Sequence, residues 1–227
     1  MIRLDRATRL YAGGVLALDD VSLEIAAHEF VAITGPSGCG KSTLMHLIAG
    51  LDTPTSGEVF VNGLALHRAA DAELTEYRRR SLGIVFQFFN LLPTMTALEN
   101  VSLPLLLAGQ RLKPAREAAQ AWLERVGMAN RSGHFPHQLS GGEMQRTAIA
   151  RALVHQPAVL LADEPTGNLE SANAAQVLDT LQKLASQRIC TMVIVTHSEE
   201  IARIAHRRIV MRDGAIVPPI EPKNPSK

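Results

Sequence analysis

The stretch Gly35-Pro36-Ser37-Gly38-Cys39-Gly40-Lys41-Ser42-Thr43 decides how the rest of the chain is expected to fold. It follows the apolar run 30–33 and precedes the largely apolar segment 44–49, an order that predicts a buried strand, a tight loop and a helix. Its spacing fits G-x-x-x-x-G-K-[ST], the pattern of a phosphate-binding loop. Glycine has no Cβ atom, so the backbone N–H groups of such a loop can converge on an anion. We therefore expect this segment to bind a nucleoside triphosphate.

Two side chains of the loop have predicted roles of their own. Lys41 is expected to reach the β- and γ-phosphates, and the Ser42 hydroxyl to take one position around Mg²⁺. The N-terminus of the following helix adds partial positive charge where the phosphates are expected to lie.

Composition limits the other possibilities. The 227 residues are 46% hydrophobic and 20% charged, an ordinary globular mixture, and the formal net charge of +1 gives no electrostatic case for binding nucleic acid. Cys39 and Cys190 lie far apart and form no metal-ligand pattern, which favours reduced thiols in the cytoplasm. The sequence has neither a membrane-spanning apolar run nor a secretory signal, so we expect any membrane role to come through a partner.

Alternating apolar and polar residues predict a small antiparallel sheet near the N-terminus. Residues 2–10 and 21–25 read as half-exposed strands, and residues 57–63 as a short strand bounded by glycines. Tyr11 follows the first of these strands, and its ring is a candidate platform for an adenine base. The alternative is a tyrosine at the end of a strand that packs on its own sheet.

The remainder reads as strands alternating with helices, which predicts a mostly parallel sheet with covered faces. Buried strands are expected at 82–87, 158–162 and 189–195, with a helix over 171–187. Residues 88–157 are predicted to form a helical lobe inserted into this core. Residues 208–217 are predicted to form a hairpin with an Asp-Gly turn, so that 1–217 form one domain. The proline-rich stretch 218–227 is predicted to be disordered.

Four polar residues follow the predicted parallel strands, at the edge where such sheets carry their functional groups. Asp163 is placed to hold Mg²⁺, and Glu164 to orient and deprotonate a water that attacks the γ-phosphate. Gln87 is a candidate ligand of Mg²⁺ or of that water, and His197 a candidate hydrogen-bond donor to the γ-phosphate. The alternatives are a carboxylate pair that only caps its strand and a structural histidine.

A second glycine-rich cluster consists of Ser140, Gly141, Gly142 and Glu143. Ser140 reads as the N-cap of a helix, and the N–H groups that follow it form another anion site. One triphosphate rarely needs two separate anion sites on one chain. If this cluster lies far from Lys41, a second copy of the chain must bring it to the phosphates, which implies a head-to-tail dimer with two nucleotides at the interface.

These motifs together resemble the ATP-binding-cassette ATPase family. The resemblance covers residues 2 to about 217, and the Leu139-Ser-Gly-Gly-Glu143 motif separates this family from other phosphate-loop ATPases. It implies an α/β fold with a phosphate-loop (RecA-like) core, an antiparallel β subdomain and an inserted helical subdomain. It also implies that Tyr11 stacks on adenine and that Ser140 and Gly142 bind the γ-phosphate of ATP on the partner copy. Gln87 is then expected to sense a transmembrane partner.

Three further segments are similar to the subgroup of lipoprotein-release, macrolide-export and cell-division ATPases: 85–93, 99–101 and 165–169. Members of this subgroup pair with permeases that have large extracytoplasmic domains, so the chain is expected at the inner face of the cell membrane. The leading hypothesis is an ATPase subunit of a transporter. The alternative is an ATPase whose membrane partner transmits force and transports nothing.

Three sequence details lead to separate expectations. Glu170 stands where the family usually carries aspartate, in a loop that the resemblance places at the dimer interface. The apolar stretch Phe88-Phe-Asn-Leu-Leu92 is a candidate docking surface for a cytoplasmic helix of the permease, with internal packing as the alternative. Cys39, inside the phosphate loop, predicts that thiol-alkylating reagents inhibit the enzyme unless ATP protects it.

Overall fold

Strand β3 (Phe30–Thr34) lies inside a six-stranded sheet, and the glycine loop follows directly from its carboxyl end. The computed structural model describes residues 1–217. The strand order is β10-β9-β3-β8-β7-β6, parallel except for the antiparallel edge pair β9–β10. The other strands are β6 (Leu82–Val85), β7 (Val159–Asp163), β8 (Thr191–Val195), β9 (Arg207–Arg212) and β10 (Ala215–Val217). This confirms the predicted parallel core and its terminal hairpin.

A second sheet has four antiparallel strands in the order β2-β1-β4-β5. They are β1 (Ile2–Tyr11), β2 (Val15–Ile25), β4 (Ser56–Val61) and β5 (Leu64–Ala65). Strand β2 begins six residues before the predicted strand, because Val15 to Asp20 continue the pairing with β1 although their side chains are mostly exposed. An exposed edge segment gives little hydrophobic alternation, so its sequence pattern is weak.

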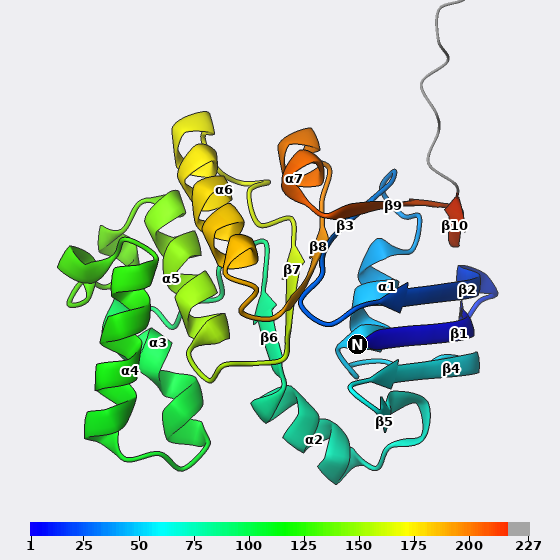
Figure 1. The fold of residues 1–227 in the computed structure, drawn as a ribbon, viewed down its shortest axis with the longest axis horizontal. Helices are drawn as coiled ribbons and strands as arrows, with labels where there is room; N and C mark the ends of the chain where they lie inside the picture. The colour runs from blue at the N-terminus through cyan, green and yellow to red at the C-terminus, as the bar shows by residue number, and fades with distance from the viewer. Residues whose placement is uncertain (218–227) are drawn as a thin grey trace, which may run out of the picture.

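Alternate residues of the parallel strands face two different hydrophobic clusters. On β3, Val31 and Ile33 pack with α1 (Lys41–Ile48), α2 (Asp71–Arg80) and the antiparallel sheet. Phe30 and Ala32 belong to the other cluster, which the remaining helices cover. Figure 1 shows α1 and the antiparallel sheet on one side of the parallel strands, and α5 and α6 on the other. The helices of this second side are α3 (Ala97–Leu107), α4 (Leu112–Arg125), α5 (Gly141–Leu153), α6 (Ser171–Ser186) and α7 (Glu199–Ile204).

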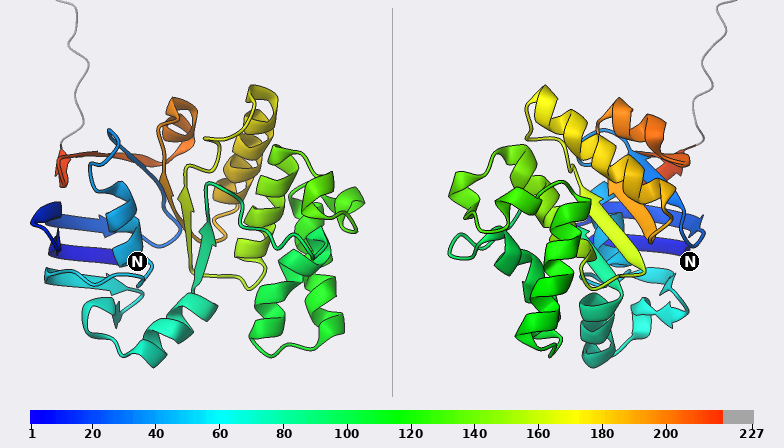
Figure 2. Two further views of the ribbon diagram at one scale, coloured as in Figure 1. Left: turned by 180° about the vertical axis from the view of Figure 1, so that it is seen from behind. Right: turned by 60° about the vertical axis from the view of Figure 1, so that its left-hand side comes forward.

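Helices α3, α4 and α5 occupy the segment expected to form a helical lobe, and 3-10 turns at Ala129–Arg131 and Pro136–Gln138 join α4 to α5. Seen from behind and from the side, this group projects away from the antiparallel strands (Figure 2). Residues of α5 share the second cluster with β7 and with α6, so α5 connects the group to the sheet. A third 3-10 turn, Leu66–Arg68, lies between β5 and α2.

The structure also contains helices that the sequence analysis missed. Helix α2 is almost entirely polar, and only Leu74 and Tyr77 meet the first cluster, so it carries little apolar periodicity. Helix α7 is a single short helix capped by Ser198. The predicted disorder of 218–227 falls outside the described residues. Within residues 1–217, no helix combines the length and the apolar character needed to span a membrane.

Candidate functional site: a phosphate loop at the carboxyl edge of the sheet

The glycine loop wraps around the Lys41 side chain. Its Nζ atom donates hydrogen bonds to the carbonyls of Gly35 (2.9 Å) and Pro36 (2.8 Å), and only 7% of Lys41 is exposed. A Cβ atom on Gly35 would lie 2.2 Å from the Met211 carbonyl oxygen, so no other residue fits there without a backbone shift. The loop therefore holds its ammonium group in place before a phosphate arrives, as the motif predicts.

Cys39 lies beneath this loop rather than on its surface. Its thiol is buried, with 3% of the residue exposed, and Sγ lies 3.8 Å from Lys41 Nζ. A reagent must open the loop to reach this sulfur. The burial argues against the sequence-based expectation of ready alkylation, because position within the loop says nothing about which way the side chain points.

The strand register brings the predicted catalytic residues to one edge of the sheet. Asp163, the last residue of β7, pairs with Val195 of β8, and Val195 pairs in turn with Ile33 of β3. The segments that follow these three strands carry Glu164, the 196–197 pair and the glycine loop. Residues far apart in the sequence thus meet beside Lys41.

Glu164 lies at the centre of a small polar network. Its Oε2 atom accepts hydrogen bonds from the Thr196 hydroxyl (3.2 Å) and from the backbone N–H of His197 (3.1 Å). Its Oε1 atom lies 3.4 Å from His197 Nε2, yet is buried and has no hydrogen-bond partner among the described residues. A carboxylate held by one oxygen, with the other free, is arranged as a general base needs to be, ready to accept a proton from a bound water.

Burial and the neighbouring Glu164 raise the pKa of Asp163, while His46 and Lys41 oppose that shift. The effect of Lys41 shows that the carboxylate faces the phosphate loop, since such charge effects act at short range. Asp163, the Ser42 hydroxyl and the Gln87 amide offer the hard oxygen ligands that Mg²⁺ prefers, so these residues fit the metal. Within residues 1–217, no cluster of three or more acidic, histidine or cysteine side chains forms a metal site, as expected for an ion held largely by phosphates and water.

Gln87 comes two residues after strand β6, which ends at Val85 rather than at the predicted residue 87. The chain leaves the sheet there, because Phe86 already lies in an exposed turn. Gln87 still lies at the site: its Nε2 atom is 3.8 Å from the Cβ position of Gly167, in the loop after Glu164. Its carbonyl accepts a hydrogen bond from Asn168 Nδ2 (3.3 Å), which ties the two loops together.

Tyr11 is the last residue of β1, and neighbours that sequence reasoning missed fix its orientation. Its hydroxyl donates to Asp52 Oδ2 (2.8 Å), and Arg9 lies over its ring with the guanidinium carbon 4.6 Å from the ring centroid. Arg9 also pairs with Asp52 at 2.7 Å. Arg9 and Tyr11 are two apart on one strand, so their shared face was readable; the partner Asp52, 41 residues on from Tyr11, was not.

The second anion site forms at the N-terminus of α5, as predicted. The Ser140 hydroxyl accepts from the Glu143 backbone N–H (3.3 Å), and Glu143 Oε2 accepts in turn from the Ser140 N–H (2.8 Å). These bonds are the largest cause of the lowered pKa of Glu143. Gly142 leaves no room for a side chain, since a Cβ there would lie 2.8 Å from Asn173. Helix α5 covers one face of the sheet and α1 the other, so the two anion sites are separated by the sheet (Figure 1).

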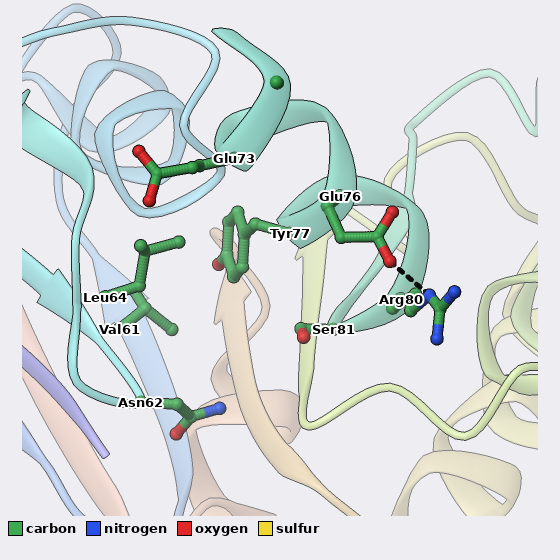
Figure 3. A pocket seen from close by; sticks show the side chains of 9 residues that line it. Val61, Asn62, Leu64, Glu73, Glu76, Tyr77, Arg80 and Ser81 are labelled. Carbon is green, nitrogen blue, oxygen red and sulfur yellow. Dashed lines mark ion pairs between the residues drawn. The ribbon is translucent and has the colours of Figure 1, made fainter. Parts of the chain in front are cut away.

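Hollows on the surface lie apart from the phosphate loop. One of about 520 Å³ lies between β4–β5 and α2, where Tyr77 and Leu64 face each other beside the ion pair of Glu76 and Arg80 (Figure 3). Another of about 360 Å³ is lined by Glu164 and His197 with the loop 166–171. A groove of about 590 Å³ runs between α2, β6, α3 and α5. Only the second of these hollows includes predicted catalytic residues.

Comparisons with known proteins agree with this geometry. The family model described as "ABC transporter" matches residues 18–167. The chain is 47% identical over 207 residues to an uncharacterised ABC transporter ATP-binding protein of Mycobacterium tuberculosis, Rv0986, covering 91% of this chain and 84% of that protein. It is 46% identical to the lipoprotein-releasing system ATP-binding protein LolD of Xanthomonas campestris, covering 95% and 92%.

A solved structure is similar over almost the whole chain. It is the dimeric, post-hydrolysis state of the ATP-binding cassette MJ0796 bound to ADP and Pi, with a TM-score of 0.86, 42% identity and coverage of 95% of this chain and 96% of that one. The phosphate loop, the carboxylates beside it and the serine-glycine helix start therefore have the same fold around them as in a nucleotide-hydrolysing cassette. The chain belongs to the ABC transporter family and is an ATP-binding ATPase of that family.

Proposed function

We propose that the chain couples ATP-driven association of two copies to an integral-membrane permease, of the lipoprotein-release or exporter type. The observation that carries this proposal is the separation of the two anion sites: the Lys41 loop and the Ser140 helix start lie on opposite faces of the sheet. Neither site alone encloses a triphosphate. Two copies in head-to-tail arrangement would place the Ser140 site of each against ATP on the other, which fits the dimeric cassette to which the chain is similar.

Each site residue has a part in this proposal. Residues 35–43 hold the phosphates, and Tyr11 stacks on the adenine. Ser42, Gln87 and Asp163 hold Mg²⁺, which supplies positive charge to the triphosphate. Residues 140–143 of the partner copy complete the γ-phosphate site. The Glu164 carboxylate accepts the proton of the attacking water, and His197 donates a hydrogen bond to the γ-phosphate.

The groove beside α3 is the proposed docking surface for the permease. Phe86, Leu103 and Leu107 line it, and Leu107 is 70% exposed. Phe88, in the loop that borders it, is 73% exposed. Large apolar side chains this exposed favour a protein partner, and a groove between helices suits an amphipathic helix. Docked in this way, the ATPase would lie at the inner face of the membrane without entering it. LolD of Xanthomonas campestris carries the name of a lipoprotein-releasing system, which is why we favour a permease of that type.

The test is co-purification with the membrane protein encoded next to the chain. We expect a stable complex whose ATPase rate rises with the permease's substrate. We expect Leu107→Asp to lose the complex while the unfolding midpoint of the isolated chain stays unchanged. A complex whose ATPase activity responds to no substrate, and which transports nothing, would favour a force-transmitting partner. Failure of the chain to bind any membrane protein would reject the proposal.

A further inference from the structure

The loop between β6 and α3 adopts a backbone conformation that its residues do not favour by themselves. Phe89 and Asn90 have φ angles of 58° and 49°, in the left-handed region. Asparagine tolerates this region, but a bulky residue such as Phe89 is an outlier there. Such conformations persist only where the surrounding structure imposes them, and they cluster at ligand clamps and switch regions.

Arg151, in the last turn of α5, holds this conformation in place. Its Nη2 atom donates to the Phe89 carbonyl (2.8 Å) and its Nη1 atom to the Asn90 carbonyl (2.5 Å). The planar guanidinium suits two adjacent carbonyls, which a lysine could not satisfy together. Burial lowers the pKa of Arg151, so these carbonyls stand in for the water that the charge has lost.

The side chain of Phe89 reaches the other end of the same helix. A Cβ atom built on Gly141 would lie 3.9 Å from Phe89 Cζ and 3.0 Å from Leu169 Cδ2. The ring therefore packs beside the start of α5, where Ser140 to Gly142 form the second anion site. Helix α5 is in contact with one phenylalanine at both ends: its first turn meets the ring, and its last turn bonds the carbonyl.

The neighbouring ring points elsewhere. Phe88 is 73% exposed beside the proposed docking groove, whereas Phe89 is half-buried against Gly141. Two consecutive aromatic side chains thus face a partner and an anion site. A change in the loop on one side must alter the contact on the other, because Arg151 fixes the backbone between them.

We propose that Arg151 and Phe89 are positioning residues that set the Ser140–Gly142 site for the triphosphate on the facing copy. A permease that contacts Phe88 would then act on the nucleotide site of the opposite copy, rather than only on the one nearest to it. This inference rests on the proposed function, because it needs the two-copy ATP site. It concerns residues with no contact to the chain's own phosphate loop among those described above.

The test separates ATP binding by one chain from ATP-dependent association of two, and it needs no permease. In a Glu164→Gln background, which holds ATP without hydrolysing it, Phe89→Ala and Arg151→Met are compared with the parent. Titration with a fluorescent ATP analogue reports binding by the phosphate loop, and analytical ultracentrifugation with ATP reports the dimer. Leu112→Ala, a truncation of an exposed apolar side chain at the start of α4, is the control.

We expect Phe89→Ala and Arg151→Met to weaken ATP-dependent association by at least about tenfold, which corresponds to about 1.4 kcal/mol, with the ATP affinity of the single chain unchanged. Arg151→Lys, which keeps the charge and one donor, should restore part of the association. Association equal to that of the parent would overturn the inference. A parallel loss of ATP affinity and of the unfolding midpoint would also overturn it, since Arg151 and Phe89 would then act only in folding. A parent that does not associate with ATP would reject the proposed function itself.

Discussion

Replacing Glu164 by glutamine should separate its catalytic from its structural contribution. The Oε2 atom of Glu164 accepts bonds from the Thr196 hydroxyl and the His197 N–H at 3.2 and 3.1 Å. An amide oxygen in that position can keep both bonds, so we expect the free energy of unfolding to change by less than about 1 kcal/mol. The amide cannot take a proton from water, and loss of a general base typically costs about 10²–10⁴ in rate.

That range corresponds to about 2.7–5.4 kcal/mol in the activation free energy. Single-turnover release of phosphate from bound ATP measures it directly, and equilibrium titration with ATP checks that affinity is kept. Glu164→Ala is the matched comparison: it removes both the base and the acceptor, so it should also lower the free energy of unfolding by about 1 kcal/mol. Turnover of Glu164→Gln within about threefold of the parent would remove Glu164 from the base role.

Three further changes test other parts of the structure. Glu170 is the N-cap of α6 without a side-chain cap bond, so Glu170→Asp should raise the free energy of unfolding by about 0.5–1 kcal/mol in a denaturant titration; no gain would mean that the shorter carboxylate does not cap this helix. Cys39 is buried, so alkylation of the ATP-free native chain should be at least about tenfold slower than that of the unfolded chain when followed by mass spectrometry, and equal rates would show that the loop opens freely. Burial lowers the pKa of His155, so its contribution to stability is complete above roughly pH 6.5 and is lost as the pH falls towards the lowered folded value; His155→Gln should therefore lose less stability on acidification, and identical pH profiles would contradict this.

The sequence predicted most of the parallel core, because its strands are buried on both faces and read as short apolar runs ended by polar residues. Asp163, Glu164 and His197 were placed correctly at the carboxyl edge for this reason. The serine cap of α5 was also readable, since its hydroxyl and Glu143 lie three residues apart in a local motif.

Long-range contacts between polar groups could not be predicted in the same way. Asp52 fixes Tyr11 from 41 residues away, and Arg151 bonds the loop at Phe89 from 62 residues away. Neither pair leaves a periodic signal, because a single hydrogen-bond partner is set by how helices and sheets pack in three dimensions. The same holds for the direction of the Cys39 side chain, which local geometry rather than sequence position decides.

The split of the ATP site between two copies is tested most directly by mixing two inactive variants. Lys41→Met disables the phosphate loop, and Ser140→Phe blocks the helix start of α5. In an equimolar mixture about half of the dimers combine the two chains, and each of these contains one intact site made from the normal Lys41 of one copy and the normal Ser140 of the other. We expect phosphate release at about a quarter of the parent's rate per chain. A mixture as inactive as either variant alone would contradict the account, because it would mean that Lys41 and Ser140 must act within a single chain.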